Sequence, residues 1–180
     1  MYQEQFPLII FNTSNKYPNT FIFVITGSDE GDYKIITQKL LDDFSNYRKV
    51  VLYKTAPQKE NETFGVDGYF IDEERFSRMV ADGDLLFYEI LPDKNFEGLT
   101  HKHASDENEW GRPLVHCCNS EYAETFKNML GENCCVIYLN NTNTTNVNPI
   151  MENATVVNFT DLDEELISKL KTTIEILKNA

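Results

Sequence analysis

A chain of 180 residues that is 41% apolar, with 12 Phe and 9 Tyr, has enough apolar surface to form a compact domain with its own core. Its 29 acidic residues outnumber its 16 basic residues and give a formal net charge of −13. This charge excludes broad binding to nucleic acids or to anionic membranes, because both require a cationic surface.

No apolar run has the length of a membrane span, and the N-terminal stretch lacks the features of a signal peptide. The four cysteines form two adjacent pairs, Cys117-Cys118 and Cys134-Cys135, without the spacing of a zinc or redox motif. We therefore expect a reduced, cytoplasmic chain without a metal site.

The first part of the chain predicts an arm, a strand and a helix. Residues 1–16 form the arm, whose apolar stretch Phe6–Phe11 could add an edge strand or dock on the domain. Phe21–Thr26 is a continuous run of β-branched and aromatic residues, typical of a strand buried on both faces. The acidic loop that follows leads to a helix from Tyr33, for which Asp32 is the expected N-cap.

The rest of the chain alternates between strand and helix patterns, which predicts a layered α/β fold with a mostly parallel sheet. Strands are expected at Lys49–Tyr53, Tyr69–Ile71, Leu85–Leu91, Leu114–Cys118, Cys134–Leu139 and Ala154–Asn158. Helices are expected after the N-cap Asp72, over Glu121–Leu130, and from the N-cap Asp161 to Lys178. We expect residues 92–109 to be irregular, although a helical turn could form before Trp110, and we expect His101 and His103 to face solvent.

The order of elements and several stretches resemble the guanylate kinase family, including the guanylate-kinase-like domains of membrane-associated scaffold proteins. The best stretch, TAPQKENETFGVDGYF (Thr55–Phe70), aligns without a gap with the family pattern T-R-x-P-R-x-G-E-x-x-G-x-D-Y-x-F. The segment IDEERFSRMVADGDLLFYEI, the spacing from Gly98 to Gly111, and the ending VVNFTDLDEELISKL are also similar. The resemblance covers roughly residues 20–180.

This resemblance implies a three-layer P-loop-kinase-like fold, with a central, mostly parallel sheet and a small inserted β-rich lobe. The guanylate-kinase-like domain is then residues 17–180. Its core comprises residues 17–52 and 99–180, its monophosphate-binding-like lobe residues 53–98, and a shortened lid loop residues 140–153.

The loop after the first buried strand lacks the chemistry of a phosphate loop, G-x-x-x-x-G-K-[S/T]. Counted from Gly27, the second glycine position is Asp32 and the lysine position is Tyr33. One inserted residue brings Lys34 into place but puts Ile35 at the hydroxyl position that holds Mg²⁺. We interpret Gly27 and Lys34 as vestiges of a nucleotide site.

Three carboxylates, Asp29, Glu30 and Asp32, further disfavour phosphate in this loop. A carboxylate about 4 Å from a phosphate costs about 4 kcal/mol at an effective dielectric constant of about 20. The spacing of these residues matches no calcium loop, so the loop is interpreted as a solvated acidic turn.

The resemblance also implies that the monophosphate clamp is depleted. The two clamp arginines fall on Ala56 and Lys59, the clamp tyrosine on Gly68, and the guanine-reading carboxylate on Phe87. The residues that remain as candidates for the cleft between core and lobe are Tyr53, Thr55, Lys59, Glu62, Asp67, Tyr69, Phe87 and Tyr88. Among them, Thr55, Glu62 and Asp67 are expected to hydrogen-bond the loop and the turn of the lobe.

Residues 140–153, where the kinases carry an arginine-bearing lid, contain neither Arg nor Lys. The sequence therefore predicts a catalytically degenerate guanylate-kinase-like domain, without catalytic residues or cofactor, that binds a protein or peptide in the cleft. The alternative is a divergent guanylate or nucleoside monophosphate kinase, or another nucleotide-binding protein. As a kinase it would be an ATP:GMP phosphotransferase that uses ATP and Mg²⁺. A third interpretation is a structural domain within a larger assembly.

Overall fold

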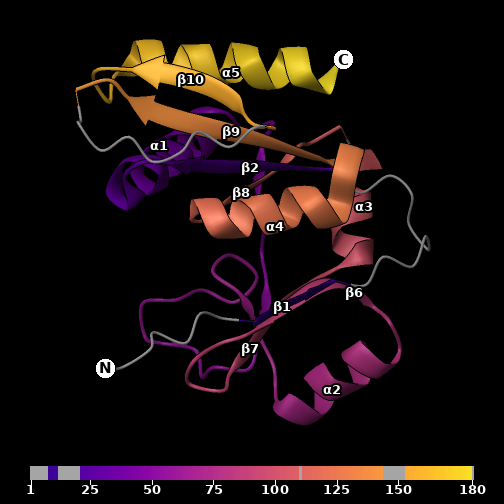
Figure 1. The fold of residues 1–180 in the computed structure, drawn as a ribbon. Helices are drawn as coiled ribbons and strands as arrows, with labels where there is room; N and C mark the ends of the chain where they lie inside the picture. Colours follow the sequence, from indigo (N-terminus) through magenta and orange to yellow (C-terminus); the bar gives the residue numbers. More distant parts are fainter. Residues whose placement is uncertain (1–7, 12–20, 110, 144–152, 180) are drawn as a thin grey trace, which may run out of the picture. The chain divides into compact units, whose positions relative to one another are not determined.

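Each of the two units of the chain has its own five-stranded sheet. The computed structural model describes residues 8–11, 21–109, 111–143 and 153–179. Unit 1 comprises Met1–Thr20 and Val50–Asp106, and unit 2 comprises Phe21–Lys49 and Glu107–Ala180 (Figure 1). The chain thus passes between the units near residues 20, 49 and 106.

The sheet of unit 2 is parallel and centred on β2 (Ile22–Gly27), in the order β10-β9-β2-β8-β3. The neighbours of β2 are β9 (Cys134–Asn141) and β8 (Leu114–Cys117), and the edges are β10 (Thr155–Phe159) and β3 (Arg48–Lys49). All six residues of β2 are buried, as expected for the central strand of a parallel sheet covered on both faces.

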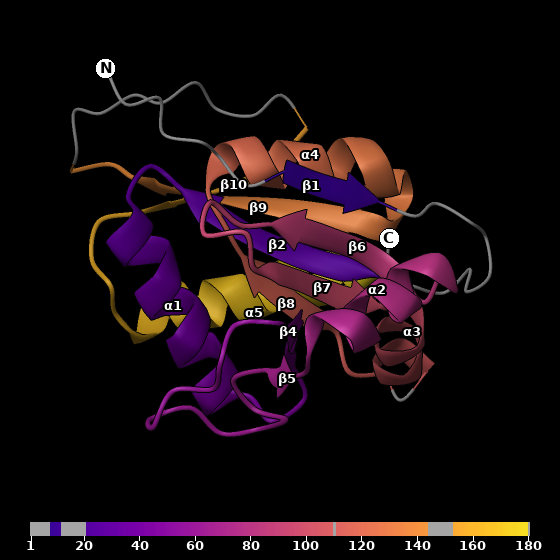
Figure 2. The ribbon, with the colours of Figure 1, turned by 90° about the horizontal axis from the view of Figure 1, so that it is seen from below.

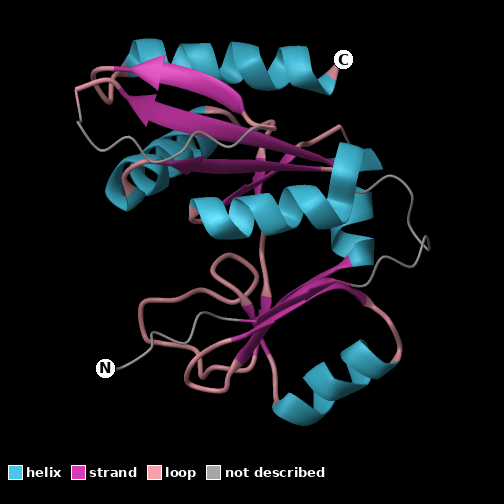
Figure 3. Cartoon of the chain, in the orientation of Figure 1, coloured by secondary structure: helices cyan, strands magenta, loops and turns pink. Residues whose placement is uncertain are grey.

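Helices α1 (Glu30–Asp43) and α5 (Glu164–Lys178) cover one face of this sheet, and α4 (Ser120–Leu130) covers the other (Figures 1 and 3). A short 3-10 helix, η1 (Gly131–Asn133), follows α4. The core on the side of α1 and α5 includes Phe23, Ile25, Tyr33, Ile36, Leu40, Val115, Ile137, Leu139, Val157, Leu166, Leu170 and Ile174. Burial of one such aliphatic side chain stabilises the fold by about 1.5–3 kcal/mol. These contacts fix both helices against the sheet.

The sheet of unit 1 has the order β1-β6-β7-β4-β5. Its strands are β1 (Leu8–Phe11), β6 (Leu85–Ile90), β7 (Phe96–Thr100), β4 (Tyr53–Lys54) and β5 (Tyr69–Phe70). Only the short pair β4·β5 is parallel, and β1 pairs antiparallel with β6. The N-terminal arm therefore adds an edge strand, which is one of the two arrangements that its apolar stretch suggested.

Helix α2 (Glu73–Ala81) covers one face of the unit 1 sheet (Figures 1 and 2). The helix packs through Phe76, whose ring stacks against Phe96 at 5.5 Å and meets the Tyr88 ring edge-on at 6.1 Å. Asp72 caps the helix as predicted, because its carboxylate accepts the N–H of Arg75. Gly83 follows the helix with a φ of 70°, which favours glycine.

Several local predictions are wrong. The predicted strand Lys49–Tyr53 is divided into β3 of unit 2 and β4 of unit 1, because the chain leaves one unit for the other at residue 50. The N-cap of α1 is Asp29 rather than Asp32, and the N-cap of α5 is Asp163 rather than Asp161.

Residues 92–109 are more regular than predicted, since they contain β7 and α3 (His101–Glu109). The strand is interrupted by a glycine, and the helix has no apolar periodicity, so neither carries a clear sequence signal. His101 is also buried, with 2% of its surface exposed, rather than facing solvent.

None of the helices within the described residues combines the length and the apolar character needed to cross a bilayer.

Gly27 provides a test of how closely β2 approaches β9. A Cβ added at Gly27 would lie 2.7 Å from the carbonyl oxygen of Leu139 and 3.2 Å from its Cβ. We therefore expect Gly27→Ala to destabilise the chain by about 1–3 kcal/mol in urea unfolding, because the backbone of β9 has to move.

The neighbouring substitution Ser28→Ala is the control. The Ser28 hydroxyl is buried and has no hydrogen-bond partner within the part of the chain that is described. Its removal should change stability by less than about 0.5 kcal/mol or raise it slightly. Equal stabilities of the two variants would contradict the proposed close contact.

Candidate functional site

The turn between β2 and α1 is very short. Gly27 ends the strand and Glu30 begins the helix, so that only Ser28 and Asp29 lie between them. The Asp29 carboxylate accepts the backbone N–H of Asp32 at 3.0 Å, and a cap of this kind stabilises a helix by about 1 kcal/mol. A helix N-terminus offers its N–H groups and positive dipole to an anion, and here a carboxylate of the chain already uses one of those groups.

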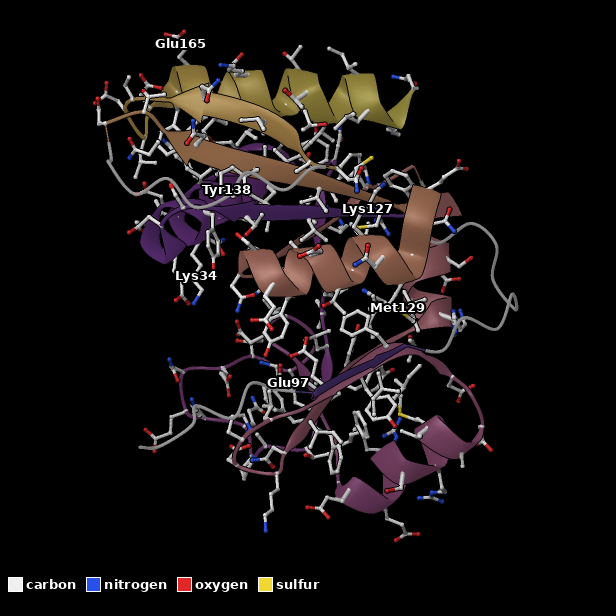
Figure 4. The ribbon with its side chains drawn as sticks, viewed as in Figure 1. Lys34, Glu97, Lys127, Met129, Tyr138 and Glu165 are labelled. Carbon is white, nitrogen blue, oxygen red and sulfur yellow. The ribbon has the colours of Figure 1, made fainter. Side chains whose placement is uncertain are left out.

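The two positions that sequence counting allows for a phosphate-binding lysine are both engaged. Tyr33 is buried in the core, and its pKa is raised by burial and by the nearby carboxylate of Glu30. The ammonium group of Lys34 forms an ion pair with Glu30 one turn earlier, on the exposed face of α1 (Figure 4). The ammonium group of Lys34 is therefore engaged by a carboxylate of the same helix.

Polar side chains connect the carboxyl ends of the strands in unit 2, where ligands usually bind in open α/β sheets. The Asn141 amide donates to the carboxylate of Asp32 at 3.0 Å and joins the end of β9 to α1. The Asn140 amide donates to the side-chain oxygen of Asn158 at 2.7 Å and joins β9 to β10. The sequence did not identify these contacts, because no motif accompanies the asparagines.

A cavity of about 260 Å³ adjoins the end of β10 and the start of α5. It is lined by Thr142, Asn158, Phe159, Thr160, Asp161, Asp163, Glu165, Leu166 and Lys169. Its one ammonium group, on Lys169, donates to the carbonyl oxygen of Asn158 at 2.9 Å. Three carboxylates against one ammonium group make this cavity unfavourable for a nucleotide phosphate.

In unit 1, two retained carboxylates hold the loop that precedes β5. Glu62 accepts the backbone N–H of Lys59 at 2.8 Å, and Asp67 accepts the backbone N–H of Thr63 at 2.8 Å. The side chain of Lys59 itself lies in an exposed stretch of the same loop. The two carboxylates thus have local partners within the loop.

Thr55 connects β4 to the turn before β7. Its hydroxyl oxygen accepts the backbone N–H of Phe96 at 2.8 Å, and the hydroxyl donates to the Asn95 side chain at 3.3 Å. These bonds give Thr55 a structural role at this turn.

The stem of Lys54 lies in the space that a side chain at Gly68, the position of the clamp tyrosine, would occupy. A Cβ added at Gly68 would lie 2.9 Å from Cδ of Lys54, whose ammonium group pairs with Glu97 at 3.6 Å. A tyrosine at residue 68 would therefore displace the stem of Lys54. Sequence reasoning missed Glu97, because it predicted no strand at β7.

The aromatic candidates lie on two faces of the unit 1 sheet. Tyr88 contacts Phe76 of α2, and Tyr53 stacks on Tyr69 at 4.8 Å on the same face. Phe87 is buried and, as the neighbour of Tyr88 in the strand, points to the opposite face. The structure therefore does not bring Tyr53 and Tyr88 together with Phe87.

The face opposite α2 carries a small charged cluster of Lys54, Glu89 and Glu97, which we call the lobe cluster (Figure 4 labels Glu97). Glu89 lies directly across from Glu97 in the register of β6 and β7. Burial, and then the charge of Glu97, raise the pKa of Glu89 to about 7. The charge of this cluster therefore changes near neutral pH.

Within the described ranges, no group of three or more His, Cys, Asp or Glu side chains is placed to hold a metal ion. All four cysteines are free thiols, and burial raises the pKa of Cys134 to about 12. Burial also lowers the pKa of His116 to about 4, and its ring lies 5.3 Å from that of Phe126. Of these residues, Cys134 is buried in the core of unit 2, and Cys117 and Cys135 pack against that core.

The chain is similar in sequence and in fold to known guanylate kinases. No family model matches the chain. The guanylate kinase of Salinibacter ruber is 25% identical over 122 residues, which are 68% of this chain and 64% of the relative. The guanylate kinase of Syntrophotalea carbinolica is 32% identical over 65 residues, which are 36% of this chain and 31% of the relative. Each alignment thus spans less than two thirds of the relative.

The crystal structure of guanylate kinase from Anaplasma phagocytophilum is similar with a TM-score of 0.59 and 21% identity. The superposition covers 87% of this chain and 85% of that chain. The chain therefore has the P-loop-kinase-like α/β fold of a guanylate kinase, as predicted, and the low-identity relatives support kinship with that family.

The raised pKa of Glu89 predicts how stability depends on pH. The folded chain retains a proton up to about pH 7 that the unfolded chain releases near the ordinary value of 4.5, so stability falls as the pH rises through this window. In Glu89→Gln, the free energy of unfolding should fall less over this pH range, by an amount on the order of 1–3 kcal/mol. At pH 8 the variant should be more stable than the wild type, and at pH 4.5 about equally stable.

Chemical unfolding at a series of pH values measures this difference. Glu60→Gln, in the exposed loop of the same unit, is the matched control and should leave the profile unchanged. Parallel profiles for wild type and Glu89→Gln would rule out a buried, protonated Glu89.

Proposed function

We propose that this chain is a guanylate-kinase-like domain that has lost phosphoryl transfer and acts by binding another protein. The main support is the start of α1, where the Asp29 carboxylate takes the N–H of Asp32 and Lys34 pairs with Glu30. Phosphoryl transfer requires cationic groups around the phosphates, and this turn presents carboxylates instead.

The lobe supports the same proposal. Ala56 and Gly68 stand at two positions of the family's phosphate clamp, and the buried Phe87 stands at the position of its guanine-reading carboxylate. Lys54, whose stem fills the space beside Gly68, is itself paired with Glu97. A monophosphate would therefore meet few free cations on this lobe.

The lobe loop favours a role in protein binding. Phe64 and Val66 are 57% and 59% exposed, although both are large and apolar. The loop is held by hydrogen bonds from Gly65 to Gly68 and from Asp67 to Thr63, and the Phe64 ring meets Tyr69 edge-on at 5.5 Å. Exposed apolar side chains on a well-connected loop are typical of recognition surfaces. With a chain charge of −13, the preferred partner is an apolar or basic segment.

A second candidate is a divergent nucleotide-binding protein or active kinase, which the fold and the two guanylate kinase relatives favour. Lys34 would then bind the phosphates of ATP with Mg²⁺, and Lys59 would bind the monophosphate. This function requires Lys34 to exchange its partner Glu30 for a phosphate.

Thermal unfolding with GMP, GDP or ATP and Mg²⁺ separates the two candidates. A ligand at about 100 times its Kd stabilises the folded state by about 2.7 kcal/mol, which raises Tm by several degrees. We expect no shift at millimolar nucleotide, whereas a known guanylate kinase measured in parallel should shift. A saturable shift of this chain would favour the second candidate.

The protein-binding role has its own test. Partners that associate with the wild-type chain should be lost with the double variant Phe64→Ser/Val66→Ser. They should be retained with Ile176→Ser, which removes an equally exposed apolar side chain from α5. Equal binding of the two variants would show that the lobe loop is not the recognition surface.

A further inference from the structure

A second cavity, of about 370 Å³, lies entirely within unit 1 and belongs to neither the nucleotide region nor the lobe loop. It is lined by Tyr53, Arg75, Met79, Asp84, Thr100 and Lys102. These residues come from β4, α2, the turn before β6, the end of β7 and the first turn of α3. The volume is in the usual range of roughly 300–1,000 Å³ for small-ligand sites.

Arg75 gives this cavity its anion-binding potential. The chain has only four arginines. Arg78, one turn further along α2, pairs with Glu74 at 3.8 Å. The guanidinium group of Arg75 forms no ion pair with any residue for which the structure gives a position, and it borders the cavity. A free guanidinium group can bind a carboxylate through two parallel hydrogen bonds.

Lys102 contributes a second cation at the rim. Its ammonium group pairs with Asp106 at 2.5 Å on α3, but 73% of the Lys102 side chain is exposed. An exposed ion pair of this kind contributes little stability, about 0–1 kcal/mol.

The remaining lining restricts the ligand further. Met79 and the Tyr53 ring, which is fixed by stacking on Tyr69, provide an apolar wall. The Asp84 carboxylate disfavours a second negative charge and can accept a hydrogen bond from a ligand N–H. The cavity therefore suits a ligand with one carboxylate, a nearby N–H and an apolar group, and disfavours a phosphate dianion.

We propose that this cavity binds the carboxylate of an N-acylated amino acid unit, with Arg75 as the principal contact. This chemistry is shared by the C-terminus of a peptide and by a small N-acyl amino acid. The proposal is independent of the proposed function, because it involves neither the start of α1 nor Phe64 and Val66.

The test uses the full chain and four probes: N-acetyl-leucine, its amide, a tetrapeptide ending in leucine, and the amide of that tetrapeptide. Binding is measured by chemical-shift titration of the ¹⁵N-labelled chain. We expect saturable binding of the two carboxylates and at least about tenfold weaker binding of the amides, as a charge-assisted hydrogen bond implies. Tighter binding of the tetrapeptide than of N-acetyl-leucine would identify a peptide C-terminus as the ligand, and equal binding a small acid.

Arg75→Gln should weaken carboxylate binding about tenfold or more. Arg78→Gln is the matched control on the same helix and should bind as the wild type does. Both residues are exposed, and equal melting curves for the two variants will confirm that they fold alike. Absence of saturable binding by any probe, equal binding of acids and amides, or equal loss in both variants would overturn the proposal.

Discussion

The contact between the Asp29 carboxylate and the start of α1 is the basis of our proposal for what the end of β2 can bind. A buried parallel strand followed by a helix directs the helix N-terminus, with its unpaired N–H groups, at the edge of the sheet. In this chain the turn supplies its own anion, since Asp29 accepts the N–H of Asp32. One of the N–H groups at the positive end of the helix is therefore already bonded within the chain.

The surrounding contacts are consistent with this arrangement. Asp32 is held by Asn141, Lys34 by Glu30, and Tyr33 is part of the core. Each interaction is modest, and together they engage the side chains of three successive residues at the start of α1. The packing of β2, α1 and α5 does not depend on a ligand, so the fold can persist without one.

The fold could be predicted largely from the sequence, because its signals are local. The apolar run at β2, the N-cap Asp72 of α2 and the alternation of strand and helix patterns predict these elements directly. The change of unit near residue 50 and helix α3 have no such local signal. Nothing in Lys49–Tyr53 shows that the chain changes unit within it, and the polar composition of α3 conceals a helix whose first residue is buried.

The site was less predictable, for a related reason. Counting residues identified which phosphate-binding groups are missing, but not what replaces them. That Lys54 covers Gly68, that Glu89 faces Glu97, and that Arg75 borders a cavity all depend on which strands and helices pair and pack, and counting residues does not show this. The pairing of β6 with β7 was hidden because β7 carries no strand signal.

The most direct test of the proposed loss of phosphoryl transfer is a steady-state assay of ADP formation from ATP, Mg²⁺ and GMP by the full chain, with an active guanylate kinase as reference. Loss of phosphoryl transfer predicts no ADP above the rate without protein, because carboxylates surround the start of α1. Turnover that is proportional to the concentration of the chain and is abolished by Lys34→Ala would contradict it.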